Sequence, residues 1–487
     1  MALQNIYLIG ICGVAMGSLA AMFHERGYAV SGSDQNIYPP MSDFLARSGI
    51  VQFNGFSADN VKNPDLVIVG NAISRGNPEL EHVLNNRIPY MSMAQALYNF
   101  FLHDKEVIAV CGTHGKSTTC ALLAHILETA GFEPSSFIGG VAINCNSNYK
   151  IGSGGYFVIE GDEYDSAYFE KVPKFIFYRP DHLVLTSLEY DHADIYSDLA
   201  EIELWFGRLV NIIPARGNIV YSSDYINLAD IVSNARSKRY SFSGGDSDFS
   251  YSFKGHAGEF SLLDIESPLG DFRLQTKLFG RFNYSNITAA VSMAKLLGAS
   301  TDDIQQGVES FSGVRRRQEI IYDKGNVKIY EDFAHHPTAI KHMLETMRER
   351  YPGACLWAVY EPRSATSRRN VFQDVLPASF FCADEILIKT PHEGSAIRAD
   401  LKLDTERLLN DISAFNEKVR ILHRVDEIIQ YISESIDLAR DNVIVLMSNG
   451  GFDGIYKRLG DVMDHVMKAG VTPEGPGRNA TTMRAGK

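Results

Sequence analysis

One stretch decides the fold: Val107-Ile108-Ala109-Val110-Cys111-Gly112-Thr113-His114-Gly115-Lys116-Ser117-Thr118. An apolar run typical of a buried strand leads into a glycine-containing turn, and residues 119–129 continue with a helical pattern. In this context Gly112, Thr113, His114, Gly115, Lys116, Ser117 and Thr118 are predicted to form a phosphate loop. Val110 stands where the Walker pattern has its first glycine, and the alternative is a structural turn with an exposed lysine.

A phosphate loop places backbone N–H groups and a helix N-terminus around phosphate oxygens. Lys116 is expected to reach the β- and γ-phosphates, and the Ser117 hydroxyl to bind Mg²⁺, which prefers oxygen ligands. Two later strand patterns end in acidic residues: 157–160 ends at Glu160, and 183–185 leads into Glu189-Tyr190-Asp191-His192. The ends of parallel strands meet at one edge of a sheet, so we expect these groups beside the loop, although acidic turns are often only solvated.

A second glycine turn follows the first strand pattern of the chain. It reads Gly10-Ile11-Cys12-Gly13-Val14-Ala15-Met16-Gly17, and Asp34 lies where a ribose-binding acid would follow. Cys12 occupies the place of the second glycine of a dinucleotide turn, which weakens the case for NAD. A pyrophosphate at the helix N-terminus remains one interpretation, and purely structural glycines are the other.

Near the last third of the chain, Tyr330-Glu331-Asp332-Phe333-Ala334-His335-His336-Pro337 places an acid and two histidines at a strand end before a helix that proline can start. The histidines could bind ribose, phosphate or substrate, or could only cap the helix. The run Arg315-Arg316-Arg317 could meet phosphates, or could be a solvated face.

Strand and helix patterns alternate over most of the chain, which is typical of doubly wound α/β domains. We predict an N-terminal Rossmann-like domain over 1–104, a central P-loop domain over 105–313, a C-terminal Rossmann-like domain over 314–470 and a mobile tail over 471–487. Residues 239–280 are expected to form an antiparallel patch.

The composition agrees with a soluble globular protein of about three domains in 487 residues. A formal net charge of -13 disfavours a general binder of nucleic acid or anionic membranes. The six cysteines form no Cys-x-x-Cys pair, which indicates a reduced, cytoplasmic protein without a zinc site. The nearly uncharged stretch 6–23 has three glycines and no basic leader, so we reject a membrane span or signal peptide there.

Five segments occur in the order seen in the Mur ligases, and the chain resembles that family over nearly its whole length. They are Gly112 to Ser117, Glu160, Asp191-His192, Gly280-Arg281-Phe282-Asn283 and Asp332 to Pro337. The resemblance implies a three-domain cytoplasmic ligase that uses ATP and Mg²⁺. Further segments, among them Gly70 to Pro78, Glu163-Tyr164-Asp165, Glu361-Pro362-Arg363-Ser364 and Met447 to Phe452, resemble the branch that joins a murein tripeptide, L-Ala-γ-D-Glu-meso-diaminopimelate, to UDP-N-acetylmuramate in peptidoglycan recycling.

The resemblance also implies roles for individual residues. Ser117, Glu160 and His192 would bind Mg²⁺; Asn283, Arg317 and Asp332 would hold ATP; Gly10, Gly13, Asp34 and Asn71 would hold the UDP sugar; and Lys116, Glu160, His192, Arg317 and His335 would serve the reaction, in which an acyl phosphate forms and an amine attacks it.

Two family features are missing. Gly207 stands where some Mur ligases carry a carbamylated lysine, and the Asp-Asn-Pro-Arg stretch that holds diaminopimelate in one member is absent. Three alternatives stay open: the L-alanine ligase of the same branch, an NAD-dependent oxidoreductase and a non-catalytic nucleotide-binding protein. The sequence does not determine the oligomeric state.

Overall fold

The computed structural model describes residues 3–37, 39, 41–391 and 397–469, and the predicted tail over 471–487 lies outside them. The chain divides into two compact units, Met1–Arg315 and Arg316–Lys487. The first unit contains two large sheets and the second unit contains one. The three-domain α/β architecture predicted from the sequence is confirmed.

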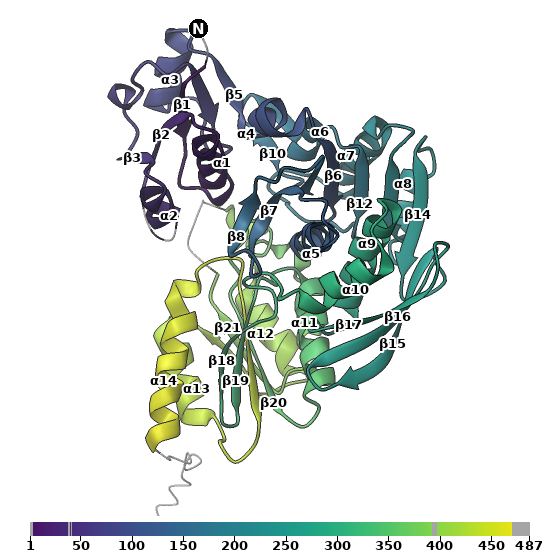
Figure 1. Ribbon diagram of the computed structural model, residues 1–487. Coiled ribbons are helices and arrows are strands. Elements are labelled where there is room, and N and C mark those ends of the chain that lie inside the picture. Colours follow the sequence, from purple (N-terminus) through teal and green to yellow (C-terminus); the bar gives the residue numbers. More distant parts are fainter. Residues whose placement is uncertain (1–2, 38, 40, 392–396, 470–487) are drawn as a thin grey trace, which may run out of the picture. The chain divides into compact units, whose positions relative to one another are not determined.

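The first sheet has five parallel strands in the order β3-β2-β1-β4-β5 (Figure 1). Its elements are β1 (Asn5–Ile9), α1 (Val14–Glu25), β2 (Ala29–Asp34), α2 (Met41–Arg47), β3 (Val51–Asn54), η1 (Ala58–Asn60), β4 (Leu66–Val69), α3 (Pro78–Asn85), β5 (Tyr90–Ser92), α4 (Met93–Leu97) and η2 (Tyr98–Leu102). Alternate residues of β1 and β4 pack against α1 and α4 on one face and against α3 on the other. The glycine turn after β1 therefore lies at the carboxyl edge of a sheet that is covered on both faces.

The central sheet has ten strands in the order β17-β16-β15-β14-β13-β12-β6-β9-β7-β8. In this spatial order, all strands from β15 to β7 run parallel to one another. The strands β8, β16 and β17 are antiparallel to their neighbours. Its strands are β6 (Glu106–Cys111), β7 (Ser135–Ala142), β8 (Ser147–Lys150), β9 (Tyr156–Gly161), β12 (His182–Leu185), β13 (Asn218–Ser222), β14 (Lys238–Ser243), β15 (Phe249–Ala257), β16 (Phe260–Glu266) and β17 (Phe272–Thr276). β10 (Asp165–Ala167) and β11 (Glu170–Pro173) form a separate antiparallel pair.

Helices cover both faces of the central sheet, as apolar strands of this kind require. One face packs against α5 (Lys116–Thr129), α9 (Arg281–Leu296) and α10 (Thr301–Ser310). The other packs against α6 (Lys174–Tyr178), α7 (Leu199–Ile212) and α8 (Ile226–Val232). That second cluster continues through Phe101 and Phe175 to α1 and α4, so the first two sheets share one hydrophobic core.

The expected antiparallel patch over 239–280 is wrong at its beginning. β14 runs parallel to β13, because α8 forms the crossover connection that parallel neighbours need. From β15 onward the antiparallel expectation is confirmed. Eight strands were not predicted: β3, β5, β8 and β18 lie at sheet edges, β10 and β11 form the separate pair, and β7 and β13 lie inside the central sheet.

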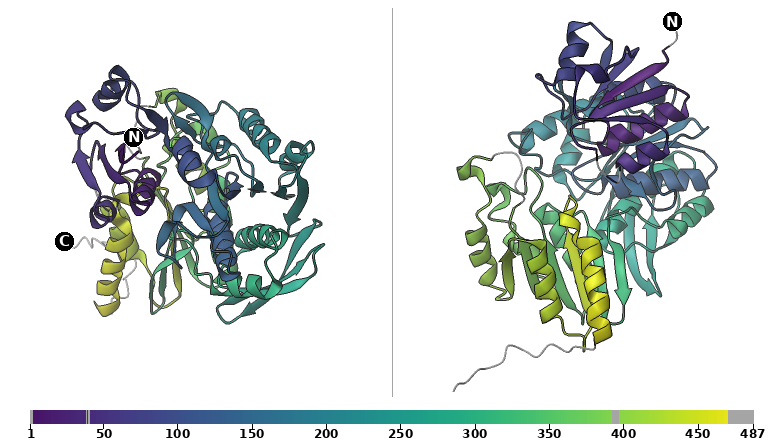
Figure 2. Two further views of the ribbon diagram at one scale, coloured as in Figure 1. Left: turned by 45° about the horizontal axis from the view of Figure 1, so that its top comes forward. Right: turned by 90° about the vertical axis from the view of Figure 1, so that its left-hand side faces the viewer.

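The second unit has one sheet in the order β18-β19-β23-β20-β21-β22, parallel except for β18. Its elements are β18 (Glu319–Lys324), β19 (Val327–Asp332), α11 (Pro337–Arg350), β20 (Cys355–Tyr360), η3 (Asn370–Phe372), η4 (Pro377–Phe380), β21 (Glu385–Lys389), η5 (Ala399–Leu401), α12 (Thr405–Ser413), β22 (Val419–Leu422), α13 (Val425–Ser435), β23 (Asn442–Met447), η6 (Phe452–Gly454) and α14 (Ile455–Ala469). α13 and α14 lie side by side on one face (Figure 2), and α11 packs against β20 and β23.

Candidate functional site

The turn between β6 and α5 has a backbone that only glycine adopts easily. Gly112 has φ +134° and Gly115 has φ +82°, both in the region that disfavours side chains. A Cβ at Gly112 would lie 2.4 Å from Thr186 Oγ1, and one at Gly115 would lie 2.2 Å from Asn286 Oδ1. No side chain caps the N-terminus of α5, so its first N–H groups are not occupied by a capping side chain. The predicted strand, glycine turn and helix are therefore present at the edge of the parallel sheet.

Lys116, the first residue of α5, folds back over this turn. Its Nζ donates to the Gly112 carbonyl at 2.6 Å and to both carboxylate oxygens of Glu163, at 2.9 and 3.1 Å. Burial of the ammonium opposes its charge, but the carboxylates of Glu163, Asp162 and Glu160 outweigh this effect and raise the pKa of Lys116. The lysine is thus held charged inside the turn.

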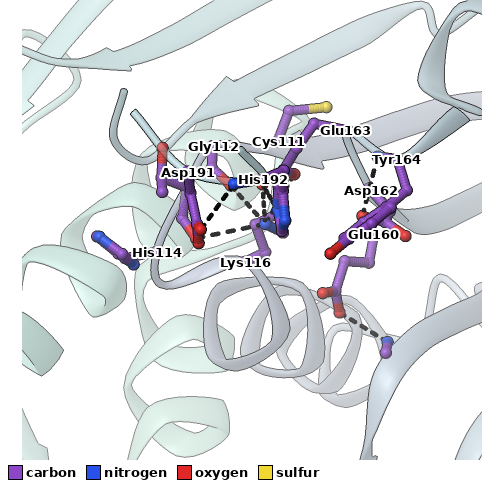
Figure 3. Close-up of polar contacts among 12 residues, drawn as sticks. Cys111, Gly112, His114, Lys116, Glu160, Asp162, Glu163, Tyr164, Asp191 and His192 are labelled. Atoms are coloured by element: carbon purple, nitrogen blue, oxygen red, sulfur yellow. Dashed lines mark hydrogen bonds and ion pairs between the residues drawn. The ribbon is translucent and has the colours of Figure 1, made fainter. Parts of the chain in front are cut away.

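Glu163 joins this lysine to His192, which follows β12 (Figure 3). The Glu163 side chain is buried, and its Oε1 lies 2.9 Å from His192 Nε2. Burial disfavours the carboxylate, yet the charges of Lys116 and His192 lower the pKa of Glu163. Burial likewise disfavours the imidazolium, yet the hydrogen bond to Glu163 raises the pKa of His192. The buried Glu163 carboxylate is therefore held between the Lys116 ammonium and the His192 imidazole.

Ser117 and Glu160 form a second polar pair beside the first. The Ser117 hydroxyl donates to Glu160 Oε1 at 3.0 Å, and the Gly139 N–H donates to Glu160 Oε2 at 2.6 Å. A hydroxyl and a carboxylate at hydrogen-bonding distance are a donor set that suits Mg²⁺. His192 does not share this contact, because its Nε2 pairs with Glu163. The residues present fit a magnesium ion at Ser117 and Glu160, and His192 would have to exchange its partner to join them.

The segment that follows β12 and the helix α9 contact the loop. His114 Nε2 lies 2.8 Å from Glu189 Oε2, and the His114 N–H donates to Ser187 Oγ at 2.7 Å. The Thr113 hydroxyl donates to the Glu189 carbonyl at 3.1 Å. Asn283 lies on α9 and accepts a hydrogen bond from Asn286 at 3.3 Å. Because Asn286 also touches the Gly115 position, α9 brings the predicted Asn283 to the region of the loop.

The N-terminal glycine turn lies at the carboxyl edge of the first sheet. The N–H groups of Gly10 and Ile11 donate to the Ser33 carbonyl at 2.8 and 2.9 Å, and the Cys12 N–H donates to Asp34 Oδ2 at 2.9 Å. Gly13 is the N-cap of α1 and has no side-chain cap. Asp34 therefore shapes the turn itself, in addition to any contact with a ligand.

Asn71 stands at the same edge, exposed in the turn that follows β4. β4 pairs with β1, so Ile9 lies beside Val69 and the turns that follow the two strands are neighbours. Gly10, Gly13, Asp34 and Asn71 are thus brought to one edge.

The remaining predicted residues lie in the second unit. The Asp332 carboxylate, at the end of β19, accepts the N–H groups of Gln318 and Ala334, both at 2.8 Å. Burial raises the pKa of Asp332 against the opposing charge of Arg317. The Arg317 guanidinium carbon lies 4.5 Å from the centre of the Phe333 ring.

The two adjacent histidines, His335 and His336, have different surroundings. His335 Nδ1 donates to the Phe333 carbonyl at 2.9 Å, and the His335 carbonyl accepts the Tyr360 hydroxyl at 3.1 Å. His336 caps α11 by accepting the Thr338 N–H at 3.2 Å. His336 is therefore a helix cap, and its role in binding stays a prediction.

Sequence reasoning did not select Glu163 or Asn286 for the site. Glu163 lies in the segment Glu163-Tyr164-Asp165 that resembles the family, but nothing local distinguishes it from Asp162, which pairs with Lys174 at 2.7 Å. Asn286 was missed because it belongs to α9, more than 160 residues beyond Gly115. No local pattern links it to the Gly115 position that it touches. All six cysteines are free thiols. Among the described residues, no helix is long and apolar enough to cross a membrane.

A strand, a glycine turn and a helix that begins with lysine, at the edge of a parallel sheet, define a P-loop nucleotide-binding domain. Three family models match the chain in succession: "Mur ligase family, catalytic domain" over residues 5–105, "Mur ligase middle domain" over 110–294 and "Mur ligase, glutamate ligase domain" over 316–450. The chain belongs to the Mur ligase family, whose members are ATP-dependent amide ligases that form a C–N bond.

Individual relatives differ in the substrate that their names give. The UDP-N-acetylmuramate–L-alanyl-γ-D-glutamyl-meso-2,6-diaminoheptandioate ligase of Escherichia coli K12 is 38% identical over 94% of this chain and 98% of its own length. A UDP-N-acetylmuramate–L-alanine ligase of Clostridium acetobutylicum is 31% identical over 92% of this chain and 95% of its own. The crystal structure of a murein peptide ligase from Psychrobacter arcticus 273-4 matches with a TM-score of 0.70 and 33% identity, over 94% of this chain and 98% of that one.

Proposed function

We propose that this protein joins the tripeptide L-Ala-γ-D-Glu-meso-diaminopimelate to UDP-N-acetylmuramate, with ATP converted to ADP and phosphate. One observation carries the proposal: the relative that is 38% identical over nearly both full lengths is named for this reaction. The carboxylates beside the phosphate loop suit Mg²⁺, and a nucleoside triphosphate binds together with such an ion. A carboxylate and an amine do not condense in water unaided, so a phosphoryl donor is required.

The reaction proceeds in two steps. The lactyl carboxylate of UDP-N-acetylmuramate attacks the γ-phosphate of ATP, ADP leaves, and an acyl phosphate forms. The free amine of the L-alanyl residue then attacks the acyl carbon, and a tetrahedral intermediate collapses with loss of phosphate and a proton to give the amide. Both steps place negative charge on oxygens that need compensation.

The central domain supplies that compensation. Lys116 and the N–H groups at the start of α5 bind and orient the β- and γ-phosphates. Ser117 and Glu160 would hold Mg²⁺, with His192 as a third ligand, and the ion would supply positive charge that neutralises phosphate oxygens. Asn283, Arg317 and Asp332 bind the rest of ATP. His335 helps to position the groups around the incoming amine.

The N-terminal domain holds the UDP sugar through Gly10, Gly13, Asp34 and Asn71. The N–H groups that open α1 face the turn, which suits a diphosphate. We assign binding of the UDP sugar to residues 1–104 and binding of ATP to residues 105–313. Residues 314–470 would bind the acceptor and part of the ATP.

The deciding experiment measures ADP release from MgATP and UDP-N-acetylmuramate with two acceptors in parallel. We expect release with the tripeptide and none with free L-alanine, and mass spectrometry of the product should show the tripeptide linked through its amine. Release with L-alanine alone would assign the protein to the second candidate, the L-alanine ligase, which the relative at 31% identity favours. Release with neither acceptor would refute the substrate proposal.

A further inference from the structure

The Lys116 ammonium is already saturated with hydrogen-bond acceptors. An ammonium has three N–H donors, and Nζ has three close acceptors, the Gly112 carbonyl and the two oxygens of Glu163, with the Thr113 carbonyl at 3.4 Å as a more distant fourth. A phosphate oxygen cannot gain a full hydrogen bond from this lysine unless one of these acceptors is given up. Binding of a nucleotide therefore competes with a contact inside the protein.

Glu163 is the acceptor set that can be given up most readily. The Gly112 carbonyl belongs to the turn that a phosphate must enter, and its position is fixed by the backbone. Glu163, in contrast, has a second partner, because its Oε1 keeps the contact with His192 Nε2 when the lysine leaves. A buried carboxylate that loses its ammonium partner but keeps a hydrogen bond to an imidazole avoids the larger penalty of an unpaired charge.

The lysine, and not the glutamate, is the partner that moves. The Tyr196 hydroxyl donates to the Glu163 carbonyl, and the next residue, Tyr164, accepts the Lys174 N–H at 3.1 Å. These contacts fix the backbone on which the carboxylate stands. Lys116 has four rotatable methylene groups and needs only a change of rotamer to turn its ammonium.

We propose that Glu163 is a positioning residue that holds Lys116 in the nucleotide-free protein, competes with the nucleotide phosphates for it, and keeps His192 oriented until the metal takes His192 as a ligand. The nucleotide part of this proposal does not depend on the acceptor substrate, and the part on His192 rests on the proposed ligase function. Glu163 thus lowers the affinity for nucleotide and supports turnover, which is a combination that a merely structural residue does not produce.

Glu163→Gln tests the competition directly. We expect ADP, titrated calorimetrically in the presence of EDTA, to bind about tenfold more tightly to this variant, because a neutral amide holds the ammonium more weakly. In the ligase assay with tripeptide, KM for ATP should fall and kcat should fall as well, since His192 loses its charged partner. Unchanged or weaker ADP binding would overturn the proposal, whether or not the wild-type protein accepts the tripeptide.

Asp162→Asn is the matched control. Asp162 is the adjacent acid and also raises the pKa of Lys116, but its carboxylate contacts Lys174. Removal of its charge should change ADP affinity by less than about twofold. An equal gain in both variants would show general charge repulsion and overturn the competition.

Two further variants keep the proposal falsifiable. If Glu163→Gln shows no cooperative melting transition, Glu163→Asp takes its place, because a carboxylate withdrawn by one methylene should also release Lys116 and tighten ADP binding. In a Lys116→Ala background, Glu163→Gln should leave ADP affinity unchanged. A gain that persists without the lysine would place the effect elsewhere and overturn the proposal.

Discussion

The molecule contains two turns of the same design, each between a buried parallel strand and a helix, and they are equipped differently. In the turn after β6, a lysine and a serine face acids from β9, and the first N–H groups of α5 have no side-chain cap. In the turn after β1, three consecutive N–H groups are bound by Ser33 and Asp34, much as Ser187 binds those of Thr113 and His114 in the other turn, but in the part of the chain that the structure describes no lysine–acid pair stands beside them. The two turns share a backbone motif and differ in the residues around it, and this difference supports the proposal that the first turn receives a triphosphate with its metal and the second a diphosphate sugar.

Lys116→Ala should have the largest effect. We expect ATP turnover to fall on the order of 10³-fold or more, because the phosphates lose their buried cation. ADP release with saturating acceptor is the measurement. Binding of UDP-N-acetylmuramate and the melting temperature should stay near wild type, and turnover within tenfold of wild type would refute the role of the loop.

Glu160→Ala tests the metal site of this turn independently of Lys116. Loss of one of the two oxygen donors beside Ser117 should raise the magnesium concentration for half-maximal activity about 10- to 100-fold. A magnesium titration of ADP release checks this expectation. Glu189→Ala removes an acid that pairs with His114 instead, so it should leave the midpoint nearly unchanged. An unaltered midpoint in Glu160→Ala would remove Glu160 from the site.

Gly115→Ala and Gly13→Ala form a matched pair across the two turns. Gly115 has φ +82° and its Cβ would meet Asn286 Oδ1 at 2.2 Å, so we expect a loss of about 1–3 kcal/mol in stability together with weaker ADP binding. Gly13 has φ −63°, and its nearest neighbour to a Cβ is Gly10 O at 3.7 Å. The free energy of unfolding of Gly13→Ala should therefore lie within about 0.5 kcal/mol of the wild-type value.

The same pair sharpens the assignment of ligands. If the turn after β1 receives a diphosphate, Gly13→Ala should weaken UDP-N-acetylmuramate binding while ADP binding stays unchanged. Calorimetric titration of both ligands gives the answer, and unchanged affinity for the UDP sugar would limit Gly13 to a structural role.

Asp34→Ala should have the smallest effect of the series on activity. The Cys12 N–H loses a charged acceptor, a contact of about 1.5–3 kcal/mol, so KM for UDP-N-acetylmuramate should rise roughly tenfold at unchanged KM for ATP. Asp34→Asn retains an acceptor oxygen, so its KM for UDP-N-acetylmuramate should lie between those of the wild type and Asp34→Ala. Equal changes in both KM values would show a general loss of structure instead.

The sequence predicted the strands with strong apolar runs, among them β1, β4, β6 and β23, because a buried strand needs such a run wherever it lies. It missed edge strands such as β3, β5 and β18, whose exposed faces need few apolar residues, and it also missed β7 and β13 inside the central sheet. It also predicted that Glu160 and His192 follow strands whose ends meet near the loop, since the order of parallel strands brings those ends together.

The sequence by itself determined the alternation of elements and the two glycine turns, because hydrophobic period and φ requirements are local properties. The partners within the site were decided only by the tertiary structure. Lys116, Glu163 and His192 stand on or after β6, β9 and β12, three neighbouring strands whose order no local pattern contains. Which of Glu160, Asp162 and Glu163 meets the lysine depends on where the chain leaves the sheet after β9, and packing of the whole central domain fixes that point.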